Sequence, residues 1–450
     1  MDFAGLLPDF GNVLYTVVAF VVALSIIVTV HEFGHYIVGR WSGIRAEVFS
    51  IGFGPKLFSR VDRRGTRWQV AAIPLGGYVK FLGDANAASA GADDATMSAL
   101  TADERRHTMH GAPLWARAVT VVAGPVFNFI LSVLIFAGIF LWVGTATDQP
   151  VIGSMVELPQ GAGDLRAGDR ILAVEGHDTP DYPALVAAVD TLPSAPVMHY
   201  LVEREGAALE VDGPALYPAR LAGVGPGTAA MSAGLKSGDV ILDIDGTPLA
   251  AFADLQAAVK AAEGRAMALT VWRPGMPVND SFSVTLAPKS TDIPTADGGF
   301  ETRWLIGATG SFSFEPLTRP TGIIEAVTRG GQEVSFIVKS SLSGLWHMVT
   351  GAISSCNLRG AIGIAETSAA AASSGAQNFI WFIAVLSTAV GFLNLFPIPV
   401  LDGGHLVFHA WEALTGKPPS DRVLNVLMAI GVALVLTLML FGLKNDLFCP

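Results

Sequence analysis

Charged residues are scarce in this chain, and cysteines are scarcer. Only 15% of the 450 residues are charged whereas 51% are apolar, and the mean hydropathy is +0.50. This composition excludes an ordinary soluble enzyme, because lipid has to cover part of so much apolar surface. The two cysteines, Cys356 and Cys449, exclude a disulfide-rich scaffold. They could pair in an oxidising compartment, but we expect them to be incidental.

The sequence contains long runs of apolar residues without a charge. Four of them have the roughly 20 apolar residues that a helix needs to cross the hydrocarbon of a bilayer: Val13–Val30, Ala118–Thr147, Thr367–Leu401 and Val423–Leu443. The sequence therefore predicts four transmembrane helices. The first twelve residues lack the basic region and the cleavage site of a signal peptide, so we expect the first span to be retained.

The placement of Lys and Arg predicts the orientation in the membrane. Ten of them lie between residues 39 and 115, which makes that side cytoplasmic and puts both termini and residues 148–366 outside. Residues 144–340 hold 24 Asp and Glu against 13 Lys and Arg. The external part is therefore an acidic soluble module, and an acidic surface repels nucleic acid, which we exclude as a partner.

The external part contains a repeat. "DLRAGDRILAVEGH" (164–177) and "GLKSGDVILDIDGT" (234–247) align at an offset of 70 residues, which indicates two copies of one supersecondary unit. The pattern resembles the PDZ domain of bacterial periplasmic proteases. That resemblance implies binding of an extended peptide or regulator by strand addition, with a terminal carboxylate held by a backbone nest at Leu221, Gly223 and Val224. A substrate filter is the functional interpretation, and a spacer is the alternative.

A metal-binding motif ends the first predicted span. His31 and His35 are four residues apart, so they share one helical face about 6 Å apart along the axis and can both reach one divalent ion. Glu32 lies beside them, close enough to take a proton from water without being a ligand, as in zinc hydrolases. Ionisable side chains at membrane depth almost always face a protein interior or an aqueous cavity, which favours a zinc site over buried structural histidines.

A catalytic zinc needs a third protein ligand and one open position. Asp402, in "NLFPIPVLDGGHL" (394–406), is the preferred candidate, because it lies at the end of the third span at a depth similar to that of His31. His405 and His409 form a rival pair with the same spacing, but no glutamate lies beside them.

The motifs "HEFGH" and "NLFPIPVLDGG", with PDZ-like repeats between them, resemble the site-2 protease family of intramembrane zinc metalloproteases. The resemblance covers nearly the whole chain. It implies one Zn²⁺ per chain, bound by His31, His35 and Asp402, with Glu32 as the catalytic base or acid. It also implies hydrolysis of peptide bonds within transmembrane segments, the substrates being single-pass proteins such as anti-sigma factors or remnant signal peptides.

Other segments match this family. "AGPVFNFIL" (123–131) resembles the signature of its second span, while residues 45–58 and 67–81 resemble its membrane-re-entrant β elements. "LRGAIGIA" (358–365) departs from the family, which usually has proline where this chain has Ala361. Pro397 and Pro399 should break the third helix and free Asn394 to contact substrate. The expected substrate-binding residues are Asn394, Pro397, Pro399, Gly52, Gly54 and Asn128.

The sequence thus predicts an α-helical polytopic protein of the bacterial inner membrane, with four transmembrane helices, re-entrant β elements and two periplasmic α+β PDZ domains. Residues 83–100, which are small and polar, should form a flexible insertion. The predicted divisions are a first helix (1–40), a cytoplasmic and re-entrant region (41–114), a second helix (115–147), two PDZ domains (148–217 and 218–290), a linker with an interfacial helix (291–366), a third helix (367–405), and a cytoplasmic loop with the fourth helix (406–450).

Two other functions remain open at this stage. A membrane scaffold or chaperone would use the metal structurally, but structural zinc sites usually fill all four positions with protein ligands. An ordinary metalloprotease would act on soluble proteins, which the predicted burial of the site disfavours.

Overall fold

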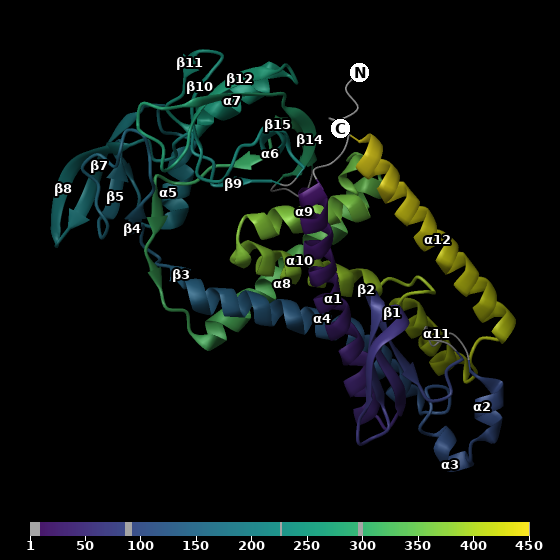
Figure 1. The fold of residues 1–450 in the computed structure, drawn as a ribbon. Helices are drawn as coiled ribbons and strands as arrows, with labels where there is room; N and C mark the ends of the chain where they lie inside the picture. The colour runs from purple at the N-terminus through teal and green to yellow at the C-terminus, as the bar shows by residue number, and fades with distance from the viewer. Residues whose placement is uncertain (1–9, 86–91, 226, 296–299, 450) are drawn as a thin grey trace. The chain divides into compact units, whose positions relative to one another are not determined.

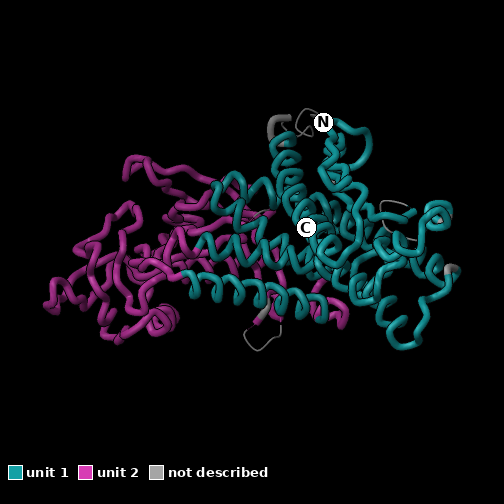
Figure 2. Tube along the Cα trace, turned by 90° about the horizontal axis from the view of Figure 1, so that it is seen from below, with its two compact units in different colours: residues 1–139, 323–346, 358–449 teal, residues 140–322, 347–357, 450 magenta. Residues whose placement is uncertain are grey.

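The computed structural model describes residues 10–85, 92–225, 227–295 and 300–449. The chain forms two compact units, coloured separately in Figure 2. Unit 1 contains residues 1–139, 323–346 and 358–449, and unit 2 contains residues 140–322 and 347–357. Part of the predicted insertion, residues 86–91, lies outside the described residues, and residues 94–99 form a short helix capped by the Asp93 side chain.

Unit 1 is mainly helical (Figure 1). Its helices are α1 (Phe10–Trp41), α2 (Asp94–Ala99), α3 (Ala102–Arg105), α4 (Leu114–Val143), most of α8 (Ile323–Val349), α9 (Ala361–Ser373), α10 (Ala376–Asn394), α11 (Asp402–Thr415) and α12 (Asp421–Phe448). Within the described residues, four helices are long and apolar enough to cross a membrane: Val13–Trp41, Leu114–Val143, Ala376–Asn394 and Arg422–Phe448. The prediction of four spanning helices is confirmed at this level.

The third predicted span is not one helix. Gly375, with φ +113°, separates α9 from α10. A second break follows Asn394, where Pro397 and Pro399 lack the N–H groups that a continuing helix would need. Asp402 is consequently the first residue of a separate helix, α11, and not the end of the span as the sequence suggested.

A long hairpin packs along α1 (Figure 1). Its strands β1 (Ala46–Val61) and β2 (Arg67–Phe81) are antiparallel, with Val61 opposite Arg67 and Ala46 opposite Phe81. These are the two segments in which the sequence predicts β elements. Bulges bend the hairpin, and the buried side chains of Phe49, Val79 and Phe81 join Tyr36 of α1 in one apolar cluster.

The N-terminus of α9 is capped by a residue from α12. Asp446 accepts hydrogen bonds from the N–H groups of Gly360, Ile362 and Gly363, at 2.8, 3.0 and 3.1 Å. Ala361, the first residue of α9, is not among these donors. The N–H of Ala361, the residue that departs from the family pattern, therefore does not take part in the cap.

This geometry predicts that Ala361→Pro is tolerated or stabilising. Proline suits the first helical position, and the extended conformation of Gly360 is the one preferred before proline. Restricting the unfolded chain should raise the free energy of unfolding by about 0.4–1 kcal/mol. Thermal denaturation of the full chain in detergent measures this change. Ala365→Pro, inside α9, is the control and should destabilise by about 3 kcal/mol; a comparable loss for Ala361→Pro would contradict the prediction.

Unit 2 contains two four-stranded sheets with the same arrangement. In order of pairing, the first is β6 (His177–Asp178), β5 (Arg170–Val174), β7 (Val197–Arg204) and β8 (Ala207–Pro214), and the second is β11 (Thr247–Pro248), β10 (Val240–Ile244), β12 (Met267–Trp272) and β13 (Phe282–Leu286). Each sheet has its own apolar core, to which its helix contributes, α5 (Tyr182–Val189) or α7 (Phe252–Ala262). Their assignment as PDZ domains stays a prediction.

The two sheets also share polar details. The turns Glu175–Gly176 and Asp245–Gly246 both have positive φ at each residue, which two-residue hairpins of type I′ require. Arg204 donates two hydrogen bonds to the buried Asp169, at 2.7 and 2.8 Å. Arg273 does the same to Asp239 at the same distances.

The segment after the second sheet returns to earlier strands. Strand β16 (Ala308–Thr309) pairs with β9 (Gly223–Val224), β17 (Phe314–Pro316) with β4 (Ile152–Met155), and β18 (Thr318–Arg319) with β3 (Thr145–Ala146). A hairpin of β14 (Lys289–Pro294) and β15 (Phe300–Leu305) precedes them, and the short helices α6 (Ala229–Ser232) and η2 (Ser355–Asn357) complete the unit. The predicted linker thus begins with paired strands.

Helix α8 (Ile323–Val349) coincides with the predicted interfacial helix. Its large apolar side chains Ile324, Phe336 and Trp346 are exposed. Its position at a membrane surface stays a prediction. The expectation that the cysteines are incidental is wrong, since both Cys356 and Cys449 are disulfide-bonded. Chain spacing alone cannot reveal such a pairing.

Candidate metal centre

Helix α1 brings His31 and His35 together one turn apart. Their Nε2 atoms are 3.1 Å from each other, and both side chains are largely buried. The i, i+4 spacing predicts this shared face. Two imidazole nitrogens that converge in this way can serve one cation.

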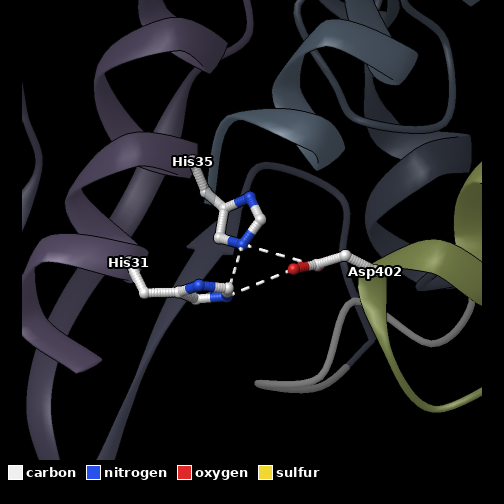
Figure 3. A group of neighbouring side chains, drawn as sticks. All are labelled: His31, His35 and Asp402. Atoms are coloured by element: carbon white, nitrogen blue, oxygen red, sulfur yellow. Dashed lines mark hydrogen bonds and ion pairs between the residues drawn. The ribbon is translucent and has the colours of Figure 1, made fainter. Parts of the chain in front are cut away.

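Asp402 approaches the histidines from α11. Its Oδ2 lies 3.2 Å from Nε2 of His31, and its Oδ1 lies 3.5 Å from Nε2 of His35. Figure 3 shows the three side chains pointing toward one another. The break at the two prolines allows this approach, because it starts a new helix at Asp402.

These three residues fit a zinc ion. Their ligand atoms all lie within 4.8 Å of one another, and among the residues that the structure describes they are the group identified as able to hold a metal. Oδ2 of Asp402 is buried and accepts no hydrogen bond, which a cation would satisfy. Two imidazoles and one carboxylate with a position left open are a known ligand set of catalytic zinc. The rival pair, His405 and His409, is not part of the group.

Helix α4 supports the two histidines from the other side. Nδ1 of His35 donates to the main-chain carbonyl of Thr120 at 2.8 Å, since a carbonyl can only accept. The proton on Nδ1 leaves the lone pair of Nε2 free for a metal. Gly124 lies directly against both rings, and Asn128 contacts Nδ1 of His31 at 3.2 Å.

A cavity of about 410 Å³ adjoins the three ligands. Glu32 lines it beside them, and the main chain of Val79 on β2 hydrogen-bonds to the Glu32 carboxylate. Glu32 is not one of the three clustered ligands, so its carboxylate is available to exchange a proton within the cavity.

Polar side chains also line the part of the cavity that lies beyond the three ligands. His405, His409 and Arg117 line it, and Arg117 forms a bidentate ion pair with Glu412 of α11 at 2.6 and 3.0 Å. Burial and the positive charge of Arg117 lower the pKa of His409 to about 4, so this imidazole is neutral at pH 7.

The expected substrate-binding residues are not all at the cavity. Asn394 lines it, and its amide also donates to the carbonyl of Val390 at 3.0 Å. Gly52 and Gly54 flank Phe53, which lines it. Pro397 and Pro399 lie in the turn between α10 and α11 and are not among the lining residues, and Asn128 is fully buried behind His31.

The expected carboxylate nest lies in unit 2. Leu221 is fully buried, and Gly223 and Val224 form strand β9. The N–H groups of Leu221 and Ala222 donate to the carbonyls of Asp239 and Thr309. A nest at this segment would therefore depend on other donors.

Sequence reasoning did not identify Thr120, Gly124 or the Arg117–Glu412 pair. A main-chain carbonyl leaves no trace in the sequence, and an ion pair between residues 295 positions apart has no local signal. Gly124 did carry one signal, because it stands between an alanine and a proline in a long apolar run.

Comparison with known proteins agrees with the geometry. The sequence profile of peptidase family M50 matches residues 19–438. Proteins of Agrobacterium fabrum and Rhizobium meliloti, each named "putative zinc metalloprotease", are 34% and 35% identical over 436 and 441 residues, covering 96% and 97% of this chain and 95% and 97% of theirs. The regulator of sigma-E protease RseP of Salmonella typhimurium is 33% identical over 463 residues, covering 97% of this chain and 99% of its own.

Proposed function

The chain belongs to peptidase family M50 and is a zinc metalloendopeptidase of the site-2 protease type, and from that premise we propose that it cleaves transmembrane segments of other proteins within the membrane. The observation that carries this proposal is the convergence of His31, His35 and Asp402 at a cavity between helices that are apolar enough to span a bilayer.

His31, His35 and Asp402 are the proposed zinc ligands. Zinc, when bound, supplies a Lewis acid that polarises the scissile carbonyl and acidifies water. Glu32 takes a proton from the attacking water and passes it to the leaving amine, because its carboxylate lines the cavity and is free of the ligand set. Asn394 offers an amide donor to the substrate or to the oxyanion that develops at the cleaved carbonyl.

A helical substrate must unwind before it is cleaved, because its carbonyls are engaged in its own hydrogen bonds. We assign the capture of the unwound strand to β1 around residues 52–55, by strand addition. Phe53 lines the cavity, so a strand paired there would enter beside Glu32. This role requires the hairpin to re-enter the membrane, where cavity water or protein can satisfy its backbone.

The topology belongs to the same proposal. The excess of Lys and Arg between residues 39 and 115 supports a bacterial inner-membrane protein with both termini and unit 2 in the periplasm. The two sheets of unit 2 are proposed as PDZ domains that select substrates or bind a regulator. The relative named regulator of sigma-E protease supports a regulatory role. Regulated proteolysis of an anti-sigma factor or of remnant signal peptides is the role that the resemblance to the site-2 protease family implies.

The test uses the full chain purified in detergent with its zinc. A model single-pass peptide should be cleaved within its apolar segment, and casein should not. Removing the zinc with a chelator should abolish cleavage, and adding zinc back should restore it. A zinc-loaded protein that leaves the peptide intact would favour the scaffold, and efficient cleavage of casein would favour an ordinary metalloprotease.

A further inference from the structure

Asn128 is a buried amide held in one place. It is 0% exposed, and its main-chain carbonyl accepts hydrogen bonds from Ser132 and Ser387, both at 3.0 Å. Gly391 of α10 packs against its Cβ, where an added methyl group would lie only 3.0 Å away. These contacts hold the main chain and the Cβ of Asn128 in place, and the cavity's lining does not include this residue.

The side-chain amide of Asn128 instead contacts the imidazole ring of His31. Its nitrogen lies 3.2 Å from Nδ1 of His31, while its Oδ1 is buried without a hydrogen-bond partner. In this arrangement the amide donates to Nδ1, so the single proton of a neutral His31 ring is on Nε2. That proton faces Nε2 of His35 at 3.1 Å, which can accept it, while Oδ2 of Asp402, 3.2 Å from Nε2 of His31, stays without a hydrogen bond.

A metal requires the other tautomer of His31. A ligand nitrogen must offer its lone pair, so with Nε2 on the metal the ring proton has to be on Nδ1. An amide can meet either demand, because its oxygen accepts and its nitrogen donates, and the two are exchanged by a half-turn about the Cβ–Cγ bond. The partner of His35 differs, since the Thr120 carbonyl only accepts and fixes one tautomer permanently.

We propose that Asn128 is a positioning residue that selects the metal-binding tautomer of His31, its Oδ1 accepting a hydrogen bond from Nδ1–H when the metal is bound. The inference rests on the proposed zinc ligands. It changes the role expected for Asn128 from binding the substrate to supporting a metal ligand. The orphaned oxygen gains its hydrogen bond in this state.

The test is the zinc affinity of the full chain in detergent, measured by competition with a chromophoric chelator. Asn128→Leu keeps the volume and removes both hydrogen-bonding atoms, and it should raise the zinc Kd by roughly 10- to 100-fold. Asn128→Asp keeps an acceptor and should bind zinc within a few-fold of the wild type. Asn394→Leu makes the same exchange in the cavity and should leave zinc affinity unchanged.

A spectroscopic readout separates positioning from packing. Long-range ¹H–¹⁵N spectra of histidine-labelled protein should show His31 protonated at Nδ1 in the zinc-loaded wild type and in Asn128→Asp. A folded Asn128→Leu protein with wild-type zinc affinity overturns the inference, and a raised KM with unchanged affinity returns Asn128 to substrate binding. If Asn128→Leu does not fold, a loss of affinity in Asn128→Asp overturns it instead. Failure of the wild type to bind zinc would refute the proposed function itself.

Discussion

Glu32→Gln abolishes peptide cleavage and leaves zinc bound. Glutamine has the size of glutamate but cannot take a proton from water, so the attacking nucleophile is no longer generated. General-base catalysis typically contributes about 10²- to 10⁴-fold to a rate, and we expect a loss of at least that size. The ligands are untouched, because Glu32 is outside the cluster of His31, His35 and Asp402.

Cleavage of a model transmembrane peptide and the zinc content of the purified protein measure the two effects separately. His31→Ala is the matched control, which should lose both activity and zinc. The trapped Glu32→Gln protein also offers a way to identify uncleaved substrates that co-purify with it. Full activity in this variant would refute the role assigned to Glu32.

Gly124→Ala should disrupt the metal centre, although its helix, α4, contributes no ligand. A methyl group at this position would overlap Nε2 of His35 and lie 2.6 Å from its Cε1 and 2.8 Å from Cε1 of His31. One ring or the whole of α4 would have to move. A displacement of about 1 Å can cost 10²-fold in rate, so we expect most of the zinc and at least about 10²-fold of the activity to be lost.

Gly138 supplies the matched control, since it lies in the same helix and a methyl group there meets nothing within 4 Å. Gly138→Ala should keep zinc and activity, because alanine is the better helix former. Zinc content and cleavage are measured on both variants. If Gly124→Ala retains its zinc, α4 does not constrain the imidazoles in the way described.

The pairing of His31 and His35 was predictable because its signal is local. An i, i+4 histidine pair with an adjacent glutamate specifies a helical face without further information. Asp402 was found by its depth along the chain and by its motif, although it heads α11 and not the end of a span. The spanning helices were equally predictable, since uninterrupted apolar length is a property of the sequence itself.

The parts that escaped prediction depend on distant partners. Strand β17 pairs with β4 across some 160 residues, and short strands carry too little periodicity to reveal such a pairing. The interruption at Gly375 was hidden because small residues continue on both sides of it. The environment of Asn128 was predictable only as hydrogen bonding inside the bundle, and its partner was not.

The proline-interrupted turn before α11 has a consequence for mechanical coupling. The ligands of the metal come from residues 31, 35 and 402, so a bound ion is a cross-link between the opening helix and a helix near the end of the chain. Nothing in the turn at Pro397 and Pro399 continues the α10 hydrogen-bond ladder into α11. Tension applied to α11 is therefore shared between a coordinate bond and the Arg117–Glu412 ion pair, while α12 is held separately by the Asp446 cap on α9.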